Sequence, residues 1–322
     1  MLFESLTVKG TTLRNRYVMP PIVNNMGVVS SQAIAFYRER ARGGVGMVIV
    51  EAVHLDRFND THFVNGLKHL ARAVHREGAA ISIQLFHNHT FDCEETDPTR
   101  ITNEQIIRFK RKFVYAAKLV REASFDGVEP HGAHGYFLNQ FFSPEHNRRT
   151  DAYGGCLENR MRMGIEIVQA IQENTDPGLL VFYRHTPVST GYTLDESIQF
   201  AAALEKAGLD ILDISPSTAS GGEHAGLAGA IKAHLTIPVI AVGGMDNPEN
   251  AQKAIEEGKC DLVAVGRGLI ADPDLPKKVI EGRPEDIVDC FACDEGCYGN
   301  LRAGKPISCQ QNPDVGREYL NA

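Results

Sequence analysis

The chain lacks any hydrophobic run long enough to cross a lipid bilayer, so we do not expect a membrane-spanning protein. Its N-terminus, MLFESLTVKG, has an early acidic residue and no long apolar core, which excludes a signal peptide. The 322 residues are 43% hydrophobic and 23% charged, a composition typical of soluble globular proteins with one large domain or two small ones. We therefore expect a cytoplasmic protein.

Excess positive charge is also absent. The net charge of -8 and the pI of about 5.8 argue against a broad nucleic-acid-binding face. No G-x-G-x-x-G sequence follows a first strand, which argues against an open nucleotide-binding sheet. The glycine-rich Gly43–Gly46 segment precedes an apolar run instead, so we predict a helix-to-strand turn there.

Eight short apolar runs alternate with helical patterns along the chain. Continuous apolar runs are typical of parallel strands that are buried on both faces. The runs are Tyr17–Ile22, Met47–Glu51, Ala80–Phe86, Gly127–Pro130, Leu179–Arg184, Ile211–Ser215, Pro238–Val242 and Leu262–Gly266. Their number favours a closed (β/α)8 TIM barrel in the α/β class, formed by residues 1–281. Residues 282–322 would form a short Cys-rich tail packed on it.

Helix signals fill the intervals between these runs. Helical spacing of apolar residues predicts helices over Ser31–Arg42, Asn65–Glu77 and Leu157–Asn174. Thr102–Gln105 is a capping box, and Asn247-Pro248 places a cap before a proline at the first helical position.

Functional residues of such a barrel lie at the carboxyl ends of its strands. The predicted strand ends bring together Pro20, Pro21, Ile22, Gln84, His131, His134, Tyr136, Arg184, Ser215, Gly243, Gly244, Gly266 and Arg267. The glycines and Arg267 follow strands seven and eight, where phosphate groups bind in this fold. The alternative is that these glycines form tight turns alone.

The stretch from residue 124 to 160 contains His131, His134 and Tyr136 directly after the fourth strand. A strand that merely turned into a helix would need Gly, Asn or Asp there, not two imidazoles and a phenol. We therefore predict a catalytic loop, with structural capping by the histidines as the alternative. The Arg- and Asn-rich part, Asn147–Arg160, is predicted to be mainly structural.

Four of the seven cysteines cluster near the C-terminus, at Cys290, Cys293, Cys297 and Cys309. In a reducing compartment such a cluster indicates a metal site, and four thiolates suit either zinc or a 4Fe–4S cluster. The three scattered cysteines are expected to be ordinary buried or half-buried residues. They are Cys93, Cys156 and Cys260.

With these residues in place, the chain resembles the old yellow enzyme family of FMN-dependent oxidoreductases. It is most similar to the iron–sulfur branch typified by bacterial 2,4-dienoyl-CoA reductase and trimethylamine dehydrogenase. The resemblance extends from Leu13 to Cys309. It rests on LRNRYVMPP, GGVGMVIVE, QLFH, FDGVEPHGAHGYFLNQFFSP, NRRTDAYGG, ENRMR, IPVIAVGG, DLVAVGRGLIADPDL and CQQNP.

The resemblance implies FMN at the barrel mouth, beside Pro20, Pro21 and Ile22. Gln84 would bind the pyrimidine edge of the flavin and Arg184 would face N1 and O2. Gly243, Gly244, Gly266 and Arg267 would hold the phosphate. His131 and His134 would bind the substrate oxygen, and Tyr136 would donate the proton. The spacing of the four tail cysteines matches the 4Fe–4S site of the family.

Several positions depart from the family pattern. Val23 stands where many relatives have Cys or Thr, and Pro130 replaces an aliphatic residue. His87-Asn88-His89-Thr90 replaces H-A-G-R, and the segment before Thr102 is shorter than in most relatives, which predicts a more open substrate pocket. Relatives of this branch usually continue into FAD- and NAD(P)H-binding domains, whereas this chain stops.

We therefore expect an FMN- and 4Fe–4S-containing ene-reductase that reduces activated C=C bonds of enones, enals or enoyl thioesters. NADH or NADPH would supply the electrons, directly or through a separate electron-donor protein. The alternatives are an amine or other dehydrogenase or demethylase that sends electrons out through the cluster, and an electron-transfer subunit reduced by a partner. The sequence does not decide the substrate, or whether the protein is a monomer or a homo-oligomer.

Overall fold

The computed structural model describes residues 1–87, 97–217 and 224–321. Residues Asn88–Thr90, where the sequence departs from the family pattern, lie outside the described residues, and so does Cys93. None of the described helices is long and apolar enough to span a membrane.

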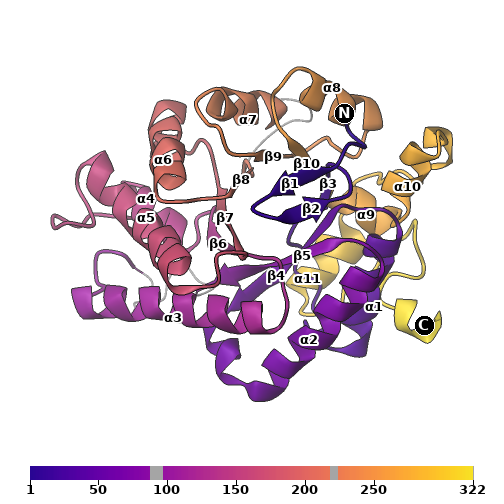
Figure 1. Cartoon of the computed structure of the whole chain (residues 1–322), viewed down its shortest axis with the longest axis horizontal. Coiled ribbons are helices and arrows are strands. Elements are labelled where there is room, and N and C mark those ends of the chain that lie inside the picture. Colours follow the sequence, from indigo (N-terminus) through magenta and orange to yellow (C-terminus); the bar gives the residue numbers. More distant parts are fainter. Residues whose placement is uncertain (88–96, 218–223, 322) are drawn as a thin grey trace.

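Eight parallel strands close into a barrel, which confirms the predicted TIM-barrel fold (Figure 1). The order around the barrel is β10-β3-β4-β5-β6-β7-β8-β9. The strands are β3 (Tyr17–Met19), β4 (Met47–His54), β5 (Ala80–Phe86), β6 (Gly127–Gly132), β7 (Leu180–His185), β8 (Ile211–Ile214), β9 (Val239–Val242) and β10 (Leu262–Ala264). The ends of six strands lie within two residues of the predicted run. The exceptions are β3, which ends three residues before Ile22, and β4, which continues three residues beyond Glu51 to His54.

Helices surround the barrel, as Figure 1 shows. The longer ones are α1 (Ser31–Arg42), α2 (Thr61–Arg76), α3 (Asn103–Glu122), α5 (Leu157–Asn174), α6 (Leu194–Lys206), α7 (His224–Lys232) and α8 (Pro248–Glu256). The short ones are α4 (Phe137–Phe142), α9 (Arg267–Ala271), α10 (Leu275–Ile280) and α11 (Asn300–Arg302).

Side-chain caps explain where several helices begin. The capping boxes of α3 and α6 are both formed, from Thr102 and from Thr193. Asn247 accepts two backbone N–H groups at the start of α8, as predicted. Helix α2 begins four residues before the predicted Asn65, because the Asp60 carboxylate accepts the first free N–H groups of the helix.

The interior of the barrel is divided into an apolar and a polar layer. Alternate residues of a strand point inward, so Leu180 and Phe182 share one face of β7 with Arg184. The lower layer is a cluster of apolar side chains from seven strands, at Val18, Met47, Ile49, Ala80, Leu180, Phe182, Ile211, Ile240, Leu262 and Ala264. The next inward positions toward the ends of β5 to β8 are polar, at Gln84, Glu129, Arg184 and Asp213, which places the functional site above a closed apolar floor.

A two-stranded hairpin, which the sequence analysis missed, closes the lower end of the barrel. It consists of β1 (Leu6–Val8) and β2 (Thr11–Leu13), and Leu13 joins the apolar layer inside the barrel. In Figure 1 the hairpin lies across the ring of strands. The opposite, carboxyl ends of the strands are therefore the open end.

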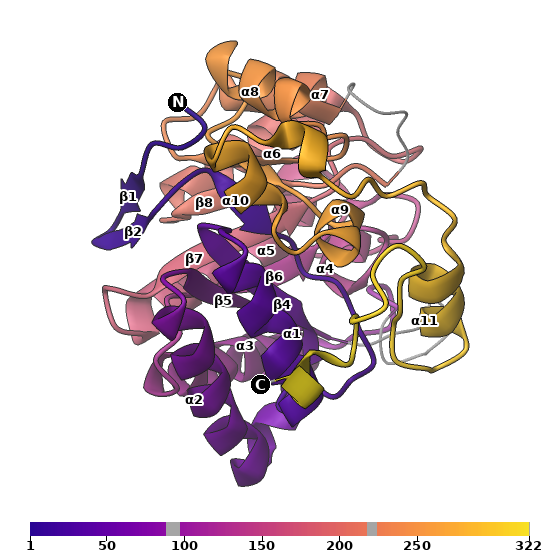
Figure 2. The same ribbon diagram turned by 90° about the vertical axis from the view of Figure 1, so that its right-hand side faces the viewer.

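The tail packs at that open end. Figure 2 shows α11 on the side of the strands opposite the hairpin. The backbone N–H of Ile307 donates to the carbonyl of Asn24 at 3.0 Å, directly after β3. A buried ion pair of 2.5 Å joins Arg40 of α1 to Glu318, and the Arg40 guanidinium also stacks on Phe36 at 3.6 Å. These contacts attach the middle and the C-terminal part of the tail to the barrel.

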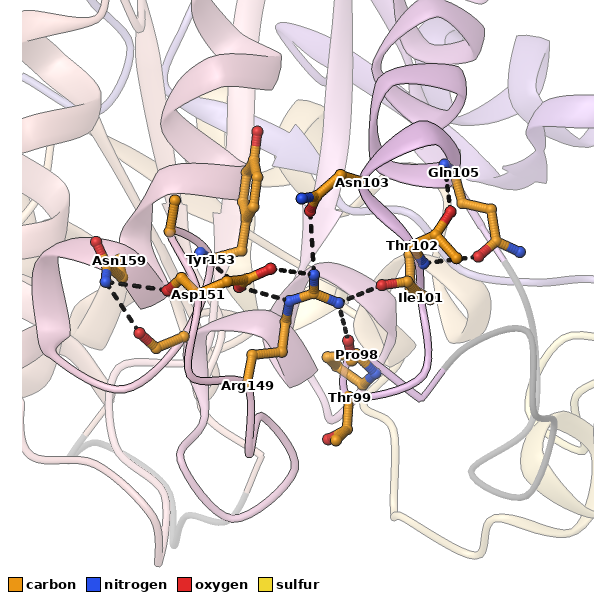
Figure 3. Close-up of polar contacts among 12 residues, drawn as sticks. Pro98, Thr99, Ile101, Thr102, Asn103, Gln105, Arg149, Asp151, Tyr153 and Asn159 are labelled. Carbon is orange, nitrogen blue, oxygen red and sulfur yellow. Dashed lines mark hydrogen bonds and ion pairs between the residues drawn. The ribbon is translucent and has the colours of Figure 1, made fainter.

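Arg149 connects the segment before α3 to the loop before α5 (Figure 3). Its guanidinium donates to the carbonyls of Pro98 and Ile101, and to the Asn103 side chain at 3.2 Å. It also forms an ion pair of 2.5 Å with Asp151. These contacts agree with the prediction that this part of the loop is mainly structural.

We expect Arg149→Ala to lower the free energy of unfolding by about 2–3 kcal/mol, because two buried carbonyls lose their charged donor. Arg148→Ala is the matched control, since that side chain is exposed, and its effect should stay within about 0.5 kcal/mol. Urea unfolding followed by circular dichroism measures both. Equal effects of the two substitutions would contradict the structural role of Arg149.

Candidate active site

Arg184 is the central charged group at the mouth of the barrel. Strand register places it beside His131 of β6 and Asp213 of β8. Its Nη2 donates to Ser215 Oγ at 3.0 Å, and its Nε lies 3.2 Å from Asp213 Oδ2. The guanidinium is 6% exposed, so it is held rigidly by groups within the barrel.

Gln84 and Glu129 form a second pair in the polar layer. They are register partners on β5 and β6, and Gln84 Nε2 donates to Glu129 Oε1 at 2.7 Å. Burial raises the pKa of Glu129, and the negative charge of Asp213 raises it further. Burial also raises the pKa of Asp213, although Arg184 opposes that change.

His131, His134 and Tyr136 gather as the sequence predicts. The ring centroid of His131 is 5.3 Å from that of His134 and 5.1 Å from that of Tyr136. Tyr136 also packs edge-on against Phe86 at 5.0 Å, which limits its rotation. His134 Nε2 lies 3.0 Å from Ser215 Oγ, so this serine connects His134 to the Arg184 guanidinium.

Both imidazoles are held in the neutral form. Burial lowers the pKa of His131 well below its ordinary value, and the neighbouring His134 ring and the charge of Arg184 add to this effect. Burial and the charge of Arg184 lower the pKa of His134 to about 3. A neutral imidazole has one N–H donor and one acceptor nitrogen, so each ring can donate a single hydrogen bond to a substrate.

The loop after β3 is held from three sides. The Asn24 backbone N–H donates to Glu51 Oε2 at 2.7 Å, and its side-chain amide donates to the Tyr37 hydroxyl at 3.1 Å. Its carbonyl accepts the bond from Ile307 of the tail. Burial raises the pKa of Glu51 to about 7. Val23, the neighbour of Asn24, is 37% exposed at the mouth.

The predicted phosphate loops lie next to this loop. Gly243 and Gly244 have φ values of 104° and 69°, which only glycine adopts readily. A Cβ atom at Gly266 would lie 3.6 Å from Ile22 Cδ1 and 3.7 Å from Pro20 Cγ, so the ends of β10 and β3 adjoin. The predicted cofactor residues Pro20, Ile22 and Gly266 are thus neighbours.

Arg267 has a partner that the sequence analysis did not foresee. It forms an ion pair of 2.6 Å with Asp294 of the tail, and its guanidinium lies 6.0 Å from the ring centroid of Tyr298. Both members of the ion pair are half-exposed. The prediction that Arg267 binds phosphate therefore has a competing contact in this structure.

The sequence analysis also missed the buried carboxyls of the mouth, Glu51, Glu129 and Asp213. One signal could have found the last two. Each is a single acidic residue inside an otherwise buried strand, at an inward position in register with a predicted site residue. An unpaired carboxylate would be too costly there, so its position alone indicates a functional cluster.

The family model for the NADH:flavin oxidoreductase / NADH oxidase family matches residues 1–98 and 89–286. The chain belongs to this family. It is therefore a member of a family of flavin-dependent oxidoreductases, as the resemblance implied. The two matched ranges meet at the short segment between β5 and α3.

Named relatives support the assignment to this oxidoreductase family. The chain is 40% identical to an NADH oxidase of Thermoanaerobacter brockii, over 98% of this chain and 56% of the relative. It is 29% identical to a cinnamate reductase of Clostridium sporogenes, over 99% of this chain and 58% of the relative. The chain thus spans little more than half the length of these relatives.

A solved structure of a 2-naphthoyl-CoA reductase complex is similar to the whole chain. The TM-score is 0.88 at 30% sequence identity, covering 99% of this chain and 58% of the other. The likeness includes the tail as well as the barrel, because only 1% of this chain lies outside it.

The residues at the mouth of the barrel fit FMN. Within the described residues, His131 Nδ1, Glu129 Oε2 and both Asp213 oxygens are buried without a hydrogen-bond partner. Such groups require a ligand, a water molecule or a proton. The polar layer, the neighbouring positive-φ glycines and the exposed Val23 together suit a flat polar ring system with a phosphate.

The tail cysteines are half-buried free thiols. The Ser308 N–H donates to the Gly296 carbonyl at 2.8 Å, which brings the segments of Cys297 and Cys309 together. Among the described residues, however, no three His, Cys, Asp or Glu side chains are grouped closely enough to hold a metal. The cluster therefore stays a prediction that rests on the chemistry and spacing of the four thiols.

The other described cysteines differ from each other. Cys260 is buried, as expected, and burial raises the pKa of its thiol to about 12. Cys156, which precedes α5, is exposed, so the expectation of a buried or half-buried residue was wrong for it. Its place at the surface follows from its position in the polar loop before the helix.

His134 should make the fold sensitive to acid. Its folded-state pKa of about 3 lies below the value of about 6.5 in an unfolded chain, so below pH 6.5 only the unfolded state binds this proton. Protonation of His134 in the unfolded chain therefore lowers the free energy of unfolding by about 1.4 kcal/mol per pH unit as the pH falls from 6.5 toward 3. Urea unfolding at several pH values measures the difference in free energy of unfolding between wild type and His134→Gln. This difference should change with pH by the same amount per unit. A pH-independent difference would contradict it.

Proposed function

We propose that the protein is an FMN-dependent ene-reductase acting on α,β-unsaturated carbonyl compounds. The observation that carries the proposal is the group of His131, His134 and Tyr136, connected through Ser215 to the buried Arg184. The names of two similar proteins, a cinnamate reductase and a 2-naphthoyl-CoA reductase, support a conjugated acyl substrate. Either an acid or a thioester fits the proposal.

Bound FMN would supply a hydride to the β-carbon of the substrate. This transfer pushes negative charge onto the carbonyl oxygen, and hydrogen-bond donors placed at that oxygen lower the barrier. His131 and His134 are neutral donors at the mouth, so they would bind the oxygen without losing a proton. Tyr136, packed between His131 and Phe86, would protonate the α-carbon.

The chain's own residues would hold the flavin. Arg184 is fully charged and buried, so it would stabilise negative charge at the N1 and O2 side of the ring. Gln84, held by Glu129, would bind the pyrimidine edge. Pro20, Pro21 and Ile22 would contact the ring, and Gly243, Gly244, Gly266 and Arg267 would hold the phosphate.

Electrons would come from NADH or NADPH, as the family name and the similar NADH oxidase suggest. The four tail cysteines would hold a 4Fe–4S cluster, which carries single electrons. A cluster beside the mouth would allow a separate electron-donor protein to supply the flavin. The contact between the tail and the loop after β3 supports this part of the proposal.

Tyr136→Phe tests the proton-donor role. We expect the oxidation of reduced enzyme by an enone to slow by about 100-fold or more, because general acid catalysis is worth about that much. Reduction by NAD(P)H should stay nearly unchanged. Stopped-flow absorbance separates the two half-reactions. Tyr115→Phe, on the exposed surface of α3, is the control, and equal slowing of both half-reactions by Tyr136→Phe would rule out the assignment.

Metal analysis of anaerobically purified protein tests the cluster. We expect about four irons per chain, as a 4Fe–4S cluster requires, and loss of most of the iron in Cys293→Ser. Cys156→Ser should keep the iron, because Cys156 is an exposed thiol before α5 and does not belong to the tail. Zinc in place of iron in the wild-type protein would overturn the cluster and leave the flavin chemistry unaffected.

A further inference from the structure

Two carboxyls and one guanidinium are buried together inside the barrel mouth. Glu129 and Asp213 are each 0% exposed and Arg184 is 6% exposed. Their three strands, β6, β7 and β8, are neighbours in the barrel, and Arg184 is the register partner of Asp213. The proposed ene-reduction uses Arg184 but gives neither carboxyl a task beyond holding Gln84.

The carboxyl oxygens are poorly satisfied. Within the described part of the chain, Glu129 Oε2 and both oxygens of Asp213 lack a hydrogen-bond partner. The Arg184 Nε atom is 3.2 Å from Asp213 Oδ2 but does not form a hydrogen bond with it. We regard this contact as an ion pair, because the short distance within a buried site suffices for strong attraction.

The electrostatic surroundings of the pair are simple. Glu129 faces Asp213 from β8, Arg184 from β7 and the uncharged Gln84 from β5. On its own strand and the following loop, His131 and His134 are neutral, because burial and the charge of Arg184 lower the pKa of each imidazole. A single positive charge therefore faces two buried carboxyls, and two negative charges in such a site repel each other.

One proton shared by the two carboxyls balances the charge. With one carboxyl ionised, the site contains one negative and one positive charge, and the remaining carboxyl can donate its proton to a neighbouring oxygen. Protons on such a pair belong to the pair rather than to either residue. Two-carboxyl sites of this kind respond strongly to any further charge nearby.

We propose that the Glu129–Asp213 pair takes up one proton from solvent when the flavin at the mouth is reduced. This inference rests on the proposed function, because it requires FMN beside Arg184. Two electrons added to the flavin bring negative charge close to the guanidinium. Arg184 then stabilises the ionised carboxyl less well, so that carboxyl binds a proton at one of its oxygens. Neither carboxyl is oxidised or reduced, and NAD(P)H supplies the electrons.

The consequence is a reduction that is coupled to a buried proton. Neutralising the pair leaves the positive charge of Arg184 for the reduced flavin, which stabilises the reduced state. Return of the electrons to a substrate would release the proton. The carboxyl pair thereby becomes neutral when the flavin is reduced. Tyr136, the proposed proton donor to the substrate, keeps its own proton during this step.

The test measures the midpoint potential of the FMN-loaded protein between about pH 6 and pH 9. For a two-electron couple, each additional proton changes the potential by about 30 mV per pH unit. The wild-type potential should therefore change more steeply with pH than that of the Glu129→Gln/Asp213→Asn double variant. We expect the difference between the two slopes to reach about 30 mV per pH unit over part of this range. An indicator dye should report one proton fewer per reduced flavin in the double variant.

Glu51→Gln is the matched control. Glu51 is also a buried carboxyl at the mouth, but it binds the Asn24 backbone instead of facing Arg184. It should keep the wild-type slope. Equal slopes of midpoint potential against pH for wild type and the double variant would overturn the proposal. Loss of the extra proton in Glu51→Gln, with the proton kept in the double variant, would overturn it as well.

A second measurement uses the wild-type protein and guards against a double variant that does not fold. The infrared difference spectrum between its reduced and oxidised forms should gain a carbonyl band of a protonated carboxyl group. No gain would overturn the inference. Failure of the protein to bind FMN would instead overturn the proposed function, so the two failures are distinguishable.

Discussion

The buried guanidinium of Arg184 is the group on which the rest of the mouth depends. A positive charge inside a closed barrel requires nearby negative charge, and the carboxyl pair of Asp213 and Glu129, on the strands on either side, supplies it. Burial lowers the pKa of both His131 and His134, and the charge of Arg184 adds to this effect, which keeps the imidazoles neutral. One residue thus acts on the protonation of several groups proposed to bind cofactor and substrate.

The barrel makes this arrangement possible through its two interior layers. Apolar side chains and the N-terminal hairpin fill the lower end, so water is excluded from beneath the polar layer. In that environment charges interact strongly and their positions are held by strand register. The site is therefore preorganised by the backbone, and loops such as the one that contains His134 and Tyr136 only complete it.

The tail extends the same organisation beyond the barrel. It is attached through Asn24, which also contacts Glu51 and Tyr37, and through the buried Arg40–Glu318 ion pair. Asn24 follows the residues proposed to contact the flavin. The side-chain amide of Asn25, in the same loop, also donates to the tail carbonyls of Leu301 and Lys305, and the Arg267–Asp294 pair offers a further connection at the predicted phosphate loop.

The sequence by itself determined the eight strands, several helix boundaries and the family, because parallel strands buried on both faces and capped helices leave strong local patterns. It also predicted His131, His134, Tyr136, Gln84 and Arg184 as one group, since barrel strands end on one face. Local patterns could not reveal the hairpin floor, or the charge balance among Glu129, Arg184 and Asp213. Those features depend on strand register and burial, which bring together residues far apart in the chain, and only the tertiary structure decides them.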